Sequence, residues 1–164
     1  MDYSNTQVRR QDRLLDEPVA RQLLQTGEFG VLSMQAEEGG GYGVPLNFAW
    51  DGQRALYVHG ALEGRKLRCL DADNRVSFCV VGATRVLSAK FTTGYESIVL
   101  ACTAHRHLPP EERLRALELI LDKYSPADKA TGLAYAQHSL PRTEIIRLDV
   151  ATWSGKCKRV GGGL

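Results

Sequence analysis

The hydrophobic and polar positions along the chain predict a protein built mainly of β-strands, with a few short helices beside them. Short apolar runs, and stretches that alternate apolar with polar residues, indicate strands. Such stretches occupy residues 29–35, 43–50, 55–60, 76–82, 95–108 and 143–150. Apolar residues at helical spacing predict helices at 17–26, at 64–72 and from Pro110 to Tyr124.

The order of these elements favours an antiparallel barrel over a doubly wound parallel sheet. The expected strands follow one another through short connections, and only two or three helices interrupt them. A strand as long as 95–108 is typical of a curved barrel strand in a small protein. No G-x-G-x-x-G motif follows the first strand, which argues against a dinucleotide-binding fold. We therefore expect one domain, residues 1–164, with a mainly β fold and peripheral helices.

Composition and charge limit the classes of partner. The chain is 43% hydrophobic and 24% charged, which is ordinary for a globular protein. A formal net charge of +2 is too small to indicate a nucleic-acid or membrane partner. The charged N-terminus lacks the apolar segment of a signal peptide, and no apolar run is long enough to span a bilayer. A cytoplasmic location is the resulting expectation.

The cysteines and histidines do not predict a metal site. The four cysteines are far apart in the sequence and form no C-x-x-C pair, so free buried thiols are favoured. They are Cys69, Cys79, Cys102 and Cys157. His105 and His107 lie at alternate strand positions, but no further ligand is near them in sequence. We interpret these two histidines as solvent-facing residues.

The segment 43–66 carries the most chemistry. We expect two strands joined by a tight turn at Asp51-Gly52. In the second strand, alternation places Tyr57 and His59 on one face and apolar residues on the other. A phenol and an imidazole are therefore expected at the mouth of a pocket.

The glycine-spaced loop after this strand predicts an anion-binding site. Gly60 and Gly64 allow close turns of the backbone, and Arg65 and Lys66 follow where a helix begins. A phosphate there would meet backbone N–H groups, the positive end of a helix dipole and two cations. The spacing is not that of a Walker A loop.

Several segments together resemble the FMN-binding split-barrel superfamily. Within it, the chain is most similar to the Nim group of 5-nitroimidazole resistance proteins, which are related to pyridoxamine 5′-phosphate oxidase. The segments are RRQDR, GEFGVLSM, YGVPLNFAW, YVHGALEGRKL, NRVSFCVVG, KFTTGYESIVLACTA and ALELILDKY. The resemblance implies a six-stranded antiparallel split barrel. It also implies a homodimer that binds FMN in two equivalent grooves at the subunit interface.

The resemblance also implies which residues would line the groove. They are Val44, Pro45, Leu46, Asn47, His59, Gly60, Ala61, Arg65, Lys66, Ser97, Trp153 and Lys156. Backbone groups of the first four would meet the flavin ring edge, and the next three would lie beside the ring and ribityl chain. The adjacent cations would hold the phosphate. The last three would complete the groove, some of them from the other subunit. The C-terminal arginine and histidine cluster of the oxidase branch is missing, so the resemblance does not extend to vitamin B6 oxidation.

Two functions follow as alternatives. One is an FMN-dependent oxidoreductase that reduces nitroaromatic or related small electron acceptors. The other is a non-enzymatic protein of the same fold that carries flavin or haem. Two cations at a helix start match a terminal phosphate and favour a flavin. His59 has a pKa suited to proton donation, and it is either catalytic or a structural hydrogen-bonding residue.

Overall fold

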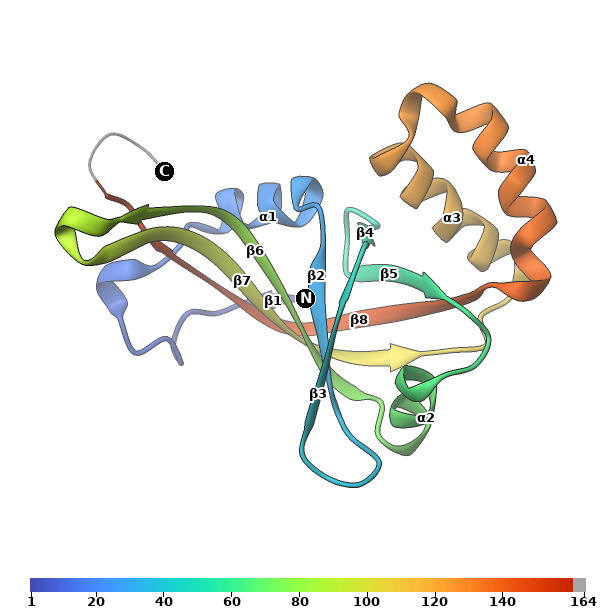
Figure 1. The fold of residues 1–164 in the computed structure, drawn as a ribbon, viewed down its shortest axis with the longest axis horizontal. Helices are drawn as coiled ribbons and strands as arrows, with labels where there is room; N and C mark the ends of the chain where they lie inside the picture. The colour runs from blue at the N-terminus through green and yellow to red at the C-terminus, as the bar shows by residue number, and fades with distance from the viewer. Residues whose placement is uncertain (161–164) are drawn as a thin grey trace.

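The computed structural model describes residues 1–160 and shows one strongly curved sheet with helices on its outside (Figure 1). The strands are β1 (Asp2–Tyr3), β2 (Gly30–Gln35), β3 (Gly41–Leu46), β4 (Ala49–Trp50), β5 (Ala55–Gly60), β6 (Arg75–Leu87), β7 (Thr92–His105) and β8 (Glu144–Lys158). The helices are α1 (Glu17–Thr26), α2 (Arg65–Ala72), α3 (Pro110–Tyr124) and α4 (Lys129–Ser139). Short 3₁₀ helices are at Gln11–Arg13, Ser88–Lys90, Pro126–Asp128 and Leu140–Arg142.

The sheet is a split barrel whose two edges are consecutive in the chain. The strand order is β3-β2-β6-β7-β8-β5-β4, antiparallel throughout, and β1 adds a short parallel pairing with β8. β3 and β4 form the two ends of this order, yet only Asn47 and Phe48 lie between them. Three Cα–Cα steps span at most about 11 Å, so the two edges approach each other there. Six strands are long and two have only two residues, which agrees with the expected six-stranded barrel.

The predicted hairpin of 43–50 with 55–60 is only partly correct. β3 pairs with β2, and only Ala49–Trp50 pairs with β5. The expected turn is present, because the Asp51 carboxylate accepts three backbone N–H bonds and Gly52 has φ 80°. The strand breaks at Asn47 and Phe48 because the chain crosses there from one edge of the barrel to the other.

The hydroxyl group of Tyr124 holds the chain in place where it crosses between the two edges of the barrel. Tyr124, the last residue of α3, accepts a hydrogen bond from the Phe48 N–H at 3.0 Å. Its Oη also lies 2.7 Å from the carbonyl oxygen of Glu28 and 2.9 Å from that of Phe48. Phe48 is fully buried, so its backbone groups have no access to water.

We expect Tyr124→Phe to lower the free energy of unfolding by about 1–3 kcal/mol, because the buried Phe48 N–H loses its partner. Urea denaturation followed by circular dichroism measures the change. Tyr135→Phe is the matched control, because the Tyr135 side chain is 67% exposed and should change stability little. Equal urea midpoints for both variants would contradict the role assigned to Tyr124.

Two clusters of buried residues lie on opposite sides of β5. Leu56 and Val58 belong to the barrel core, whereas Ala55 and Tyr57 pack under the α3–α4 helical hairpin. The expectation that the Tyr57 phenol would stand at the mouth of a pocket is therefore wrong. A strand covered on both faces buries consecutive residues, and alternation alone does not reveal the second cover.

Several strand boundaries also differ from expectation, and one helix was not expected. β6 and β8 extend to Leu87 and Lys158, well beyond the apolar runs that predicted them. The outer part of the β6–β7 hairpin is exposed, so its sequence has no apolar face to signal a strand. α4 was not predicted, because Gly132 interrupts it and its apolar residues do not form one face. The structure accounts for Gly132, since a Cβ atom there would lie 2.5 Å from Leu121 Cδ2 of α3.

No helix within residues 1–160 is long and apolar enough to cross a membrane.

Candidate functional site

The loop between β5 and α2 gives the site its backbone frame. Gly64 has φ +134°, a conformation that favours glycine, and it directly precedes the first helical residue. No side chain of residues 1–160 caps the N-terminus of α2. The Leu67 N–H donates to the Gly64 carbonyl oxygen at 3.1 Å, so within the described residues the N–H groups of Arg65 and Lys66 remain available to an acceptor from outside the helix.

Lys66 is the cation that fits an anion at this position. It is half-buried, and none of the ion pairs found within residues 1–160 includes it. Burial lowers the pKa of its ammonium group. Its Nζ lies against the backbone of Gly60, so close that a Cβ atom on that glycine would be only 2.7 Å away. A bound phosphate would offset the cost of keeping this charge partly buried.

Arg65 is placed differently from Lys66, although the two residues are adjacent. Its guanidinium is 2.5 Å from the Glu38 carboxylate and lies 4.4 Å from the centre of the Tyr42 ring. Both partners belong to the β2–β3 hairpin. Because Arg65 is already paired, it is a weaker candidate than Lys66 for holding a phosphate.

His59 lies at the end of β5, one residue before the loop, and its side chain is exposed. Partial desolvation, and secondly the charge of Lys66, lower the pKa of His59 below its ordinary value. Tyr57, two residues earlier, is instead buried, and its hydroxyl lies 3.0 Å from the Glu112 carboxylate. Burial and this carboxylate raise the pKa of Tyr57 to about 12. Of the expected phenol and imidazole, only the imidazole reaches the surface.

β3 supplies unpaired backbone groups, as the predicted contacts from Val44 to Asn47 require. It is an edge strand, hydrogen-bonded only to β2 within the described part of the chain. Pro45 contributes no N–H, so this edge offers more acceptors than donors at that point. The Asn47 side chain donates to the carbonyl oxygen of Glu28 at 3.0 Å and thereby fixes the end of the strand. Ala61, at the start of the glycine loop, is exposed.

The last three candidates, Ser97 of β7 and Trp153 and Lys156 of β8, do not share one face. Trp153 is 2% exposed and packs edge-on against Tyr3 inside the barrel, with ring centres 4.6 Å apart. Its side chain is thus a core residue, and the expectation that it lines a surface groove is not met. Ser97 and Lys156 are paired in register between β7 and β8, and both are partly exposed.

Within one chain, Ser97 and Lys156 lie far from the glycine loop. Gly60 pairs with Glu144 of β8, whereas Ser97 pairs with Lys156, 156 − 144 = 12 residues further along that strand. At about 3.3 Å per residue this separation is about 40 Å along the strand. Figure 1 shows β8 extending across the molecule between these two regions. One chain brings together His59, Gly60 and Lys66, but not Ser97 or Lys156.

A buried ion pair links α2, which follows the glycine loop, to β8, which pairs with β5 beside that loop. Arg106 donates to the Glu144 carboxylate at 3.3 Å, and Glu144 is itself only 5% exposed. The same guanidinium pairs with Asp71 and lies 3.5 Å from the carbonyl oxygen of Leu67, both in α2. Arg106 therefore ties α2 to the start of β8, next to Gly60. Sequence analysis did not identify this pair, because its members are far apart in the chain.

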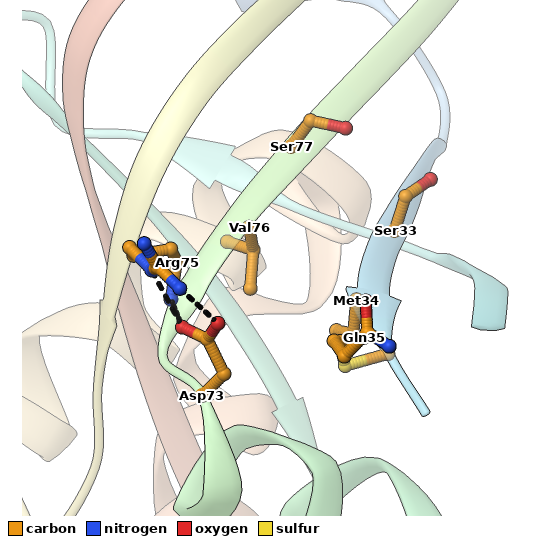
Figure 2. A pocket seen from close by; sticks show the side chains of 7 residues that line it. All are labelled: Ser33, Met34, Gln35, Asp73, Arg75, Val76 and Ser77. Atoms are coloured by element: carbon orange, nitrogen blue, oxygen red, sulfur yellow. Dashed lines mark hydrogen bonds and ion pairs between the residues drawn. The ribbon is translucent and has the colours of Figure 1, made fainter. Parts of the chain in front are cut away.

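The polar hollow between β2 and β6 lacks all of the candidate residues (Figure 2). Its floor includes Ser33 and Ser77, which are paired in register on the two strands. At its side, Arg75 donates to the Asp73 carboxylate at 2.7 and 3.0 Å, and this pairing lowers the pKa of Asp73 to about 2. A cation and a carboxylate that satisfy each other leave little for a ligand to bind.

A second, mostly apolar cavity adjoins His59 and was not anticipated from the sequence. Its walls come from α3 and α4, and α4 itself was not predicted. The leucines of α3 were recognised as an apolar stripe, but only the packed hairpin shows that part of this stripe faces an opening.

Metal-ligating groups do not cluster in residues 1–160, where no three His, Cys, Asp or Glu side chains could hold an ion together. His105 lies 3.2 Å from the Asp149 carboxylate alone. All four cysteines are free, and all are buried except Cys79, which is half-buried.

Comparison with known proteins places the chain in a family. The family model for pyridoxamine 5′-phosphate oxidase matches residues 16–157. A search of curated proteins found no match.

Solved structures with the same fold include flavin-binding proteins. A proposed 5-nitroimidazole antibiotic resistance protein from Bacteroides thetaiotaomicron VPI-5482 has a TM-score of 0.71 and 19% identity, over 88% of this chain and 86% of that chain. An FAD-binding protein from Mesorhizobium loti has a TM-score of 0.62 and 21% identity, over 90% and 98% of the two chains. An FAD- and haem-binding protein from Mycobacterium smegmatis has a TM-score of 0.67 and 18% identity, over 90% and 74%. Because the family match spans most of the sequence and the split-barrel fold agrees with it, the chain belongs to the pyridoxamine 5′-phosphate oxidase family.

Proposed function

We propose that this protein binds FMN and uses it to reduce nitroaromatic or related small electron acceptors. The observation that carries the proposal is Lys66, a half-buried cation beside Gly60 and the uncapped start of α2. Family membership supports a flavin, and the similarity to the Bacteroides thetaiotaomicron protein suggests the substrate class. A terminal phosphate is the group that best fits one cation beside the free backbone N–H groups at a helix start.

In this proposal the residues of the chain position the cofactor and handle protons. Lys66 and the N-terminus of α2 would hold the phosphate, and the open edge of β3 would meet polar atoms of the ring. A bound flavin accepts a hydride and passes electrons on one or two at a time. His59, at the cavity next to this site, would supply a proton to the acceptor during reduction.

An absorption spectrum of the purified protein tests the cofactor. We expect the two visible bands of an oxidised flavin and, after denaturation, release of FMN identified by chromatography. Released FAD would correct the cofactor while keeping the flavin. A Soret band without flavin absorption would instead support the alternative, a haem-binding protein of the same fold.

We also propose that the site is completed across a homodimer. The separation of Ser97 and Lys156 from Lys66 within one chain supports this, since one flavin cannot reach both regions. Val81 and Val99, both about half exposed, lie on the same surface as Ser97 and offer an apolar patch for a second copy.

We expect a dimer in sedimentation equilibrium, with one FMN per chain. Val99→Glu should weaken the dimer and release flavin together, because a charge would be buried at the interface. Val86→Glu is the control at an exposed position near the hairpin tip, where the side chain is 74% exposed. A monomer that still binds FMN stoichiometrically would overturn the shared site.

A further inference from the structure

A cavity of about 370 Å³ lies between the end of β5 and the α3–α4 hairpin. Large apolar side chains of α3 form one wall, namely Leu117, Ile120 and Leu121. Natural ligand cavities start at about 300 Å³, and an apolar cavity of about 150 Å³ already holds benzene. The space is therefore large enough for a substituted aromatic ring.

The sequence of α4 explains why this space is not filled. Gly132, Ala136 and Ser139 line the cavity, and their spacing of four and three residues places them on one helical face. At Gly132 the two helices approach closely, since a Cβ there would lie 2.5 Å from Leu121 Cδ2, whereas Ala136 and Ser139 place only small side chains opposite the large apolar residues of α3. The facing surfaces cannot interlock along their whole length, so a cavity remains.

The polar rim of the cavity selects for negative or hydrogen-bond-accepting groups. His59 and Arg142 lie on the rim, and none of the lining residues among 1–160 is acidic. Arg142 is exposed, and no ion pair within the described part of the chain includes it. Apolar walls, together with the guanidinium of Arg142 and the hydrogen-bonding imidazole of His59 on the rim, complement an aromatic ring that carries an anionic or strongly accepting substituent.

We propose that this cavity binds the aromatic substrate of the protein, with the ring against α3 and its acceptor groups facing His59 and Arg142. The assignment rests on the proposed flavin function, because His59 belongs both to the rim and to the surroundings of Lys66. A ring held in the cavity lies next to His59, a lining residue whose imidazole can donate or accept a proton. Arg142 would be the specificity-determining residue for charge.

Calorimetric titration of the purified protein with 4-nitrobenzoate and with nitrobenzene tests the cavity directly. Arg142→Gln should weaken 4-nitrobenzoate binding by about 5- to 20-fold, as expected for a lost, partly screened charge contact. The affinity for nitrobenzene, which lacks the carboxylate, should change less than about 2-fold. Arg115→Gln removes the same charge from an exposed position of α3 outside the cavity, and it should leave both affinities unchanged.

Ala136→Leu provides a second variant, since the larger side chain would occupy the cavity and reduce the affinity for both ligands by at least about 10-fold. If its melting curve shows that it does not fold, the Arg142 comparison still decides. The proposal is overturned if wild-type protein binds neither ligand, if folded Ala136→Leu binds both normally, or if Arg115→Gln matches Arg142→Gln. The flavin absorption spectrum of the same sample distinguishes failure of the cavity proposal from failure of the flavin proposal. Flavin without aromatic binding overturns only the cavity, whereas cavity binding without flavin overturns only the cofactor.

Discussion

Replacing His59 with Ala is expected to slow reduction of a nitroimidazole by about 10²–10⁴-fold, the loss typical of a general acid, while FMN stays bound. His59 adjoins the cavity and precedes the loop proposed to bind the phosphate, so we do not expect its side chain to hold the phosphate. The measurement pairs flavin occupancy with single-turnover reoxidation of the reduced protein by the nitro compound. His138→Ala is the control, an exposed histidine of α4 that does not line the cavity.

The rate of reoxidation by the nitro compound should depend on pH in one direction. Partial desolvation, and secondly the charge of Lys66, lower the pKa of His59, so at a given pH less of its imidazole is protonated than in a free histidine. If His59 donates the proton, the reoxidation rate should rise as pH falls towards its pKa, and His59→Ala should remove that dependence. Loss of flavin from His59→Ala, with a normal rate in the remaining holoprotein, would make His59 a structural contact.

Lys66→Ala is expected to weaken FMN binding by about 1.5–3 kcal/mol, the range for a charge-assisted hydrogen bond. Lys66 has no carboxylate partner in residues 1–160, so its charge is available to the phosphate. Fluorescence titration of the flavin-free protein with FMN and with riboflavin measures the effect. Riboflavin lacks the phosphate, so its affinity should change little.

Two neighbouring cations serve as comparisons for Lys66. Arg65→Ala should weaken FMN binding less than Lys66→Ala does, because Arg65 is already paired with Glu38. Arg68→Ala, one turn into α2, should have no effect, since Arg68 is paired with Glu37. Equal losses from all three substitutions would indicate a general effect of net charge and would contradict the specific phosphate contact.

The local pattern was sufficient to predict most of the helices and strands. α1 and β5 begin and end where the apolar spacing predicts, and α2 starts one residue later. The glycine loop with Lys66 could also be predicted, because a tight turn and a helix start both depend on residues adjacent in the chain. The extended β6–β7 hairpin and α4 could not, since neither has the amphipathic repeat by which surface elements are recognised.

The sequence by itself therefore determined that this chain forms a β-barrel with a basic glycine loop after β5. Only the tertiary structure decided which side chains reach that loop. Tyr57 is covered by the α3–α4 hairpin, Trp153 points into the barrel, and Arg65 is held by Glu38. Each of these outcomes depends on contact with a segment distant in the sequence, and periodicity records only whether a position is apolar. The cavity beside His59 has the same origin, because it exists only where the small residues of α4 meet the large ones of α3.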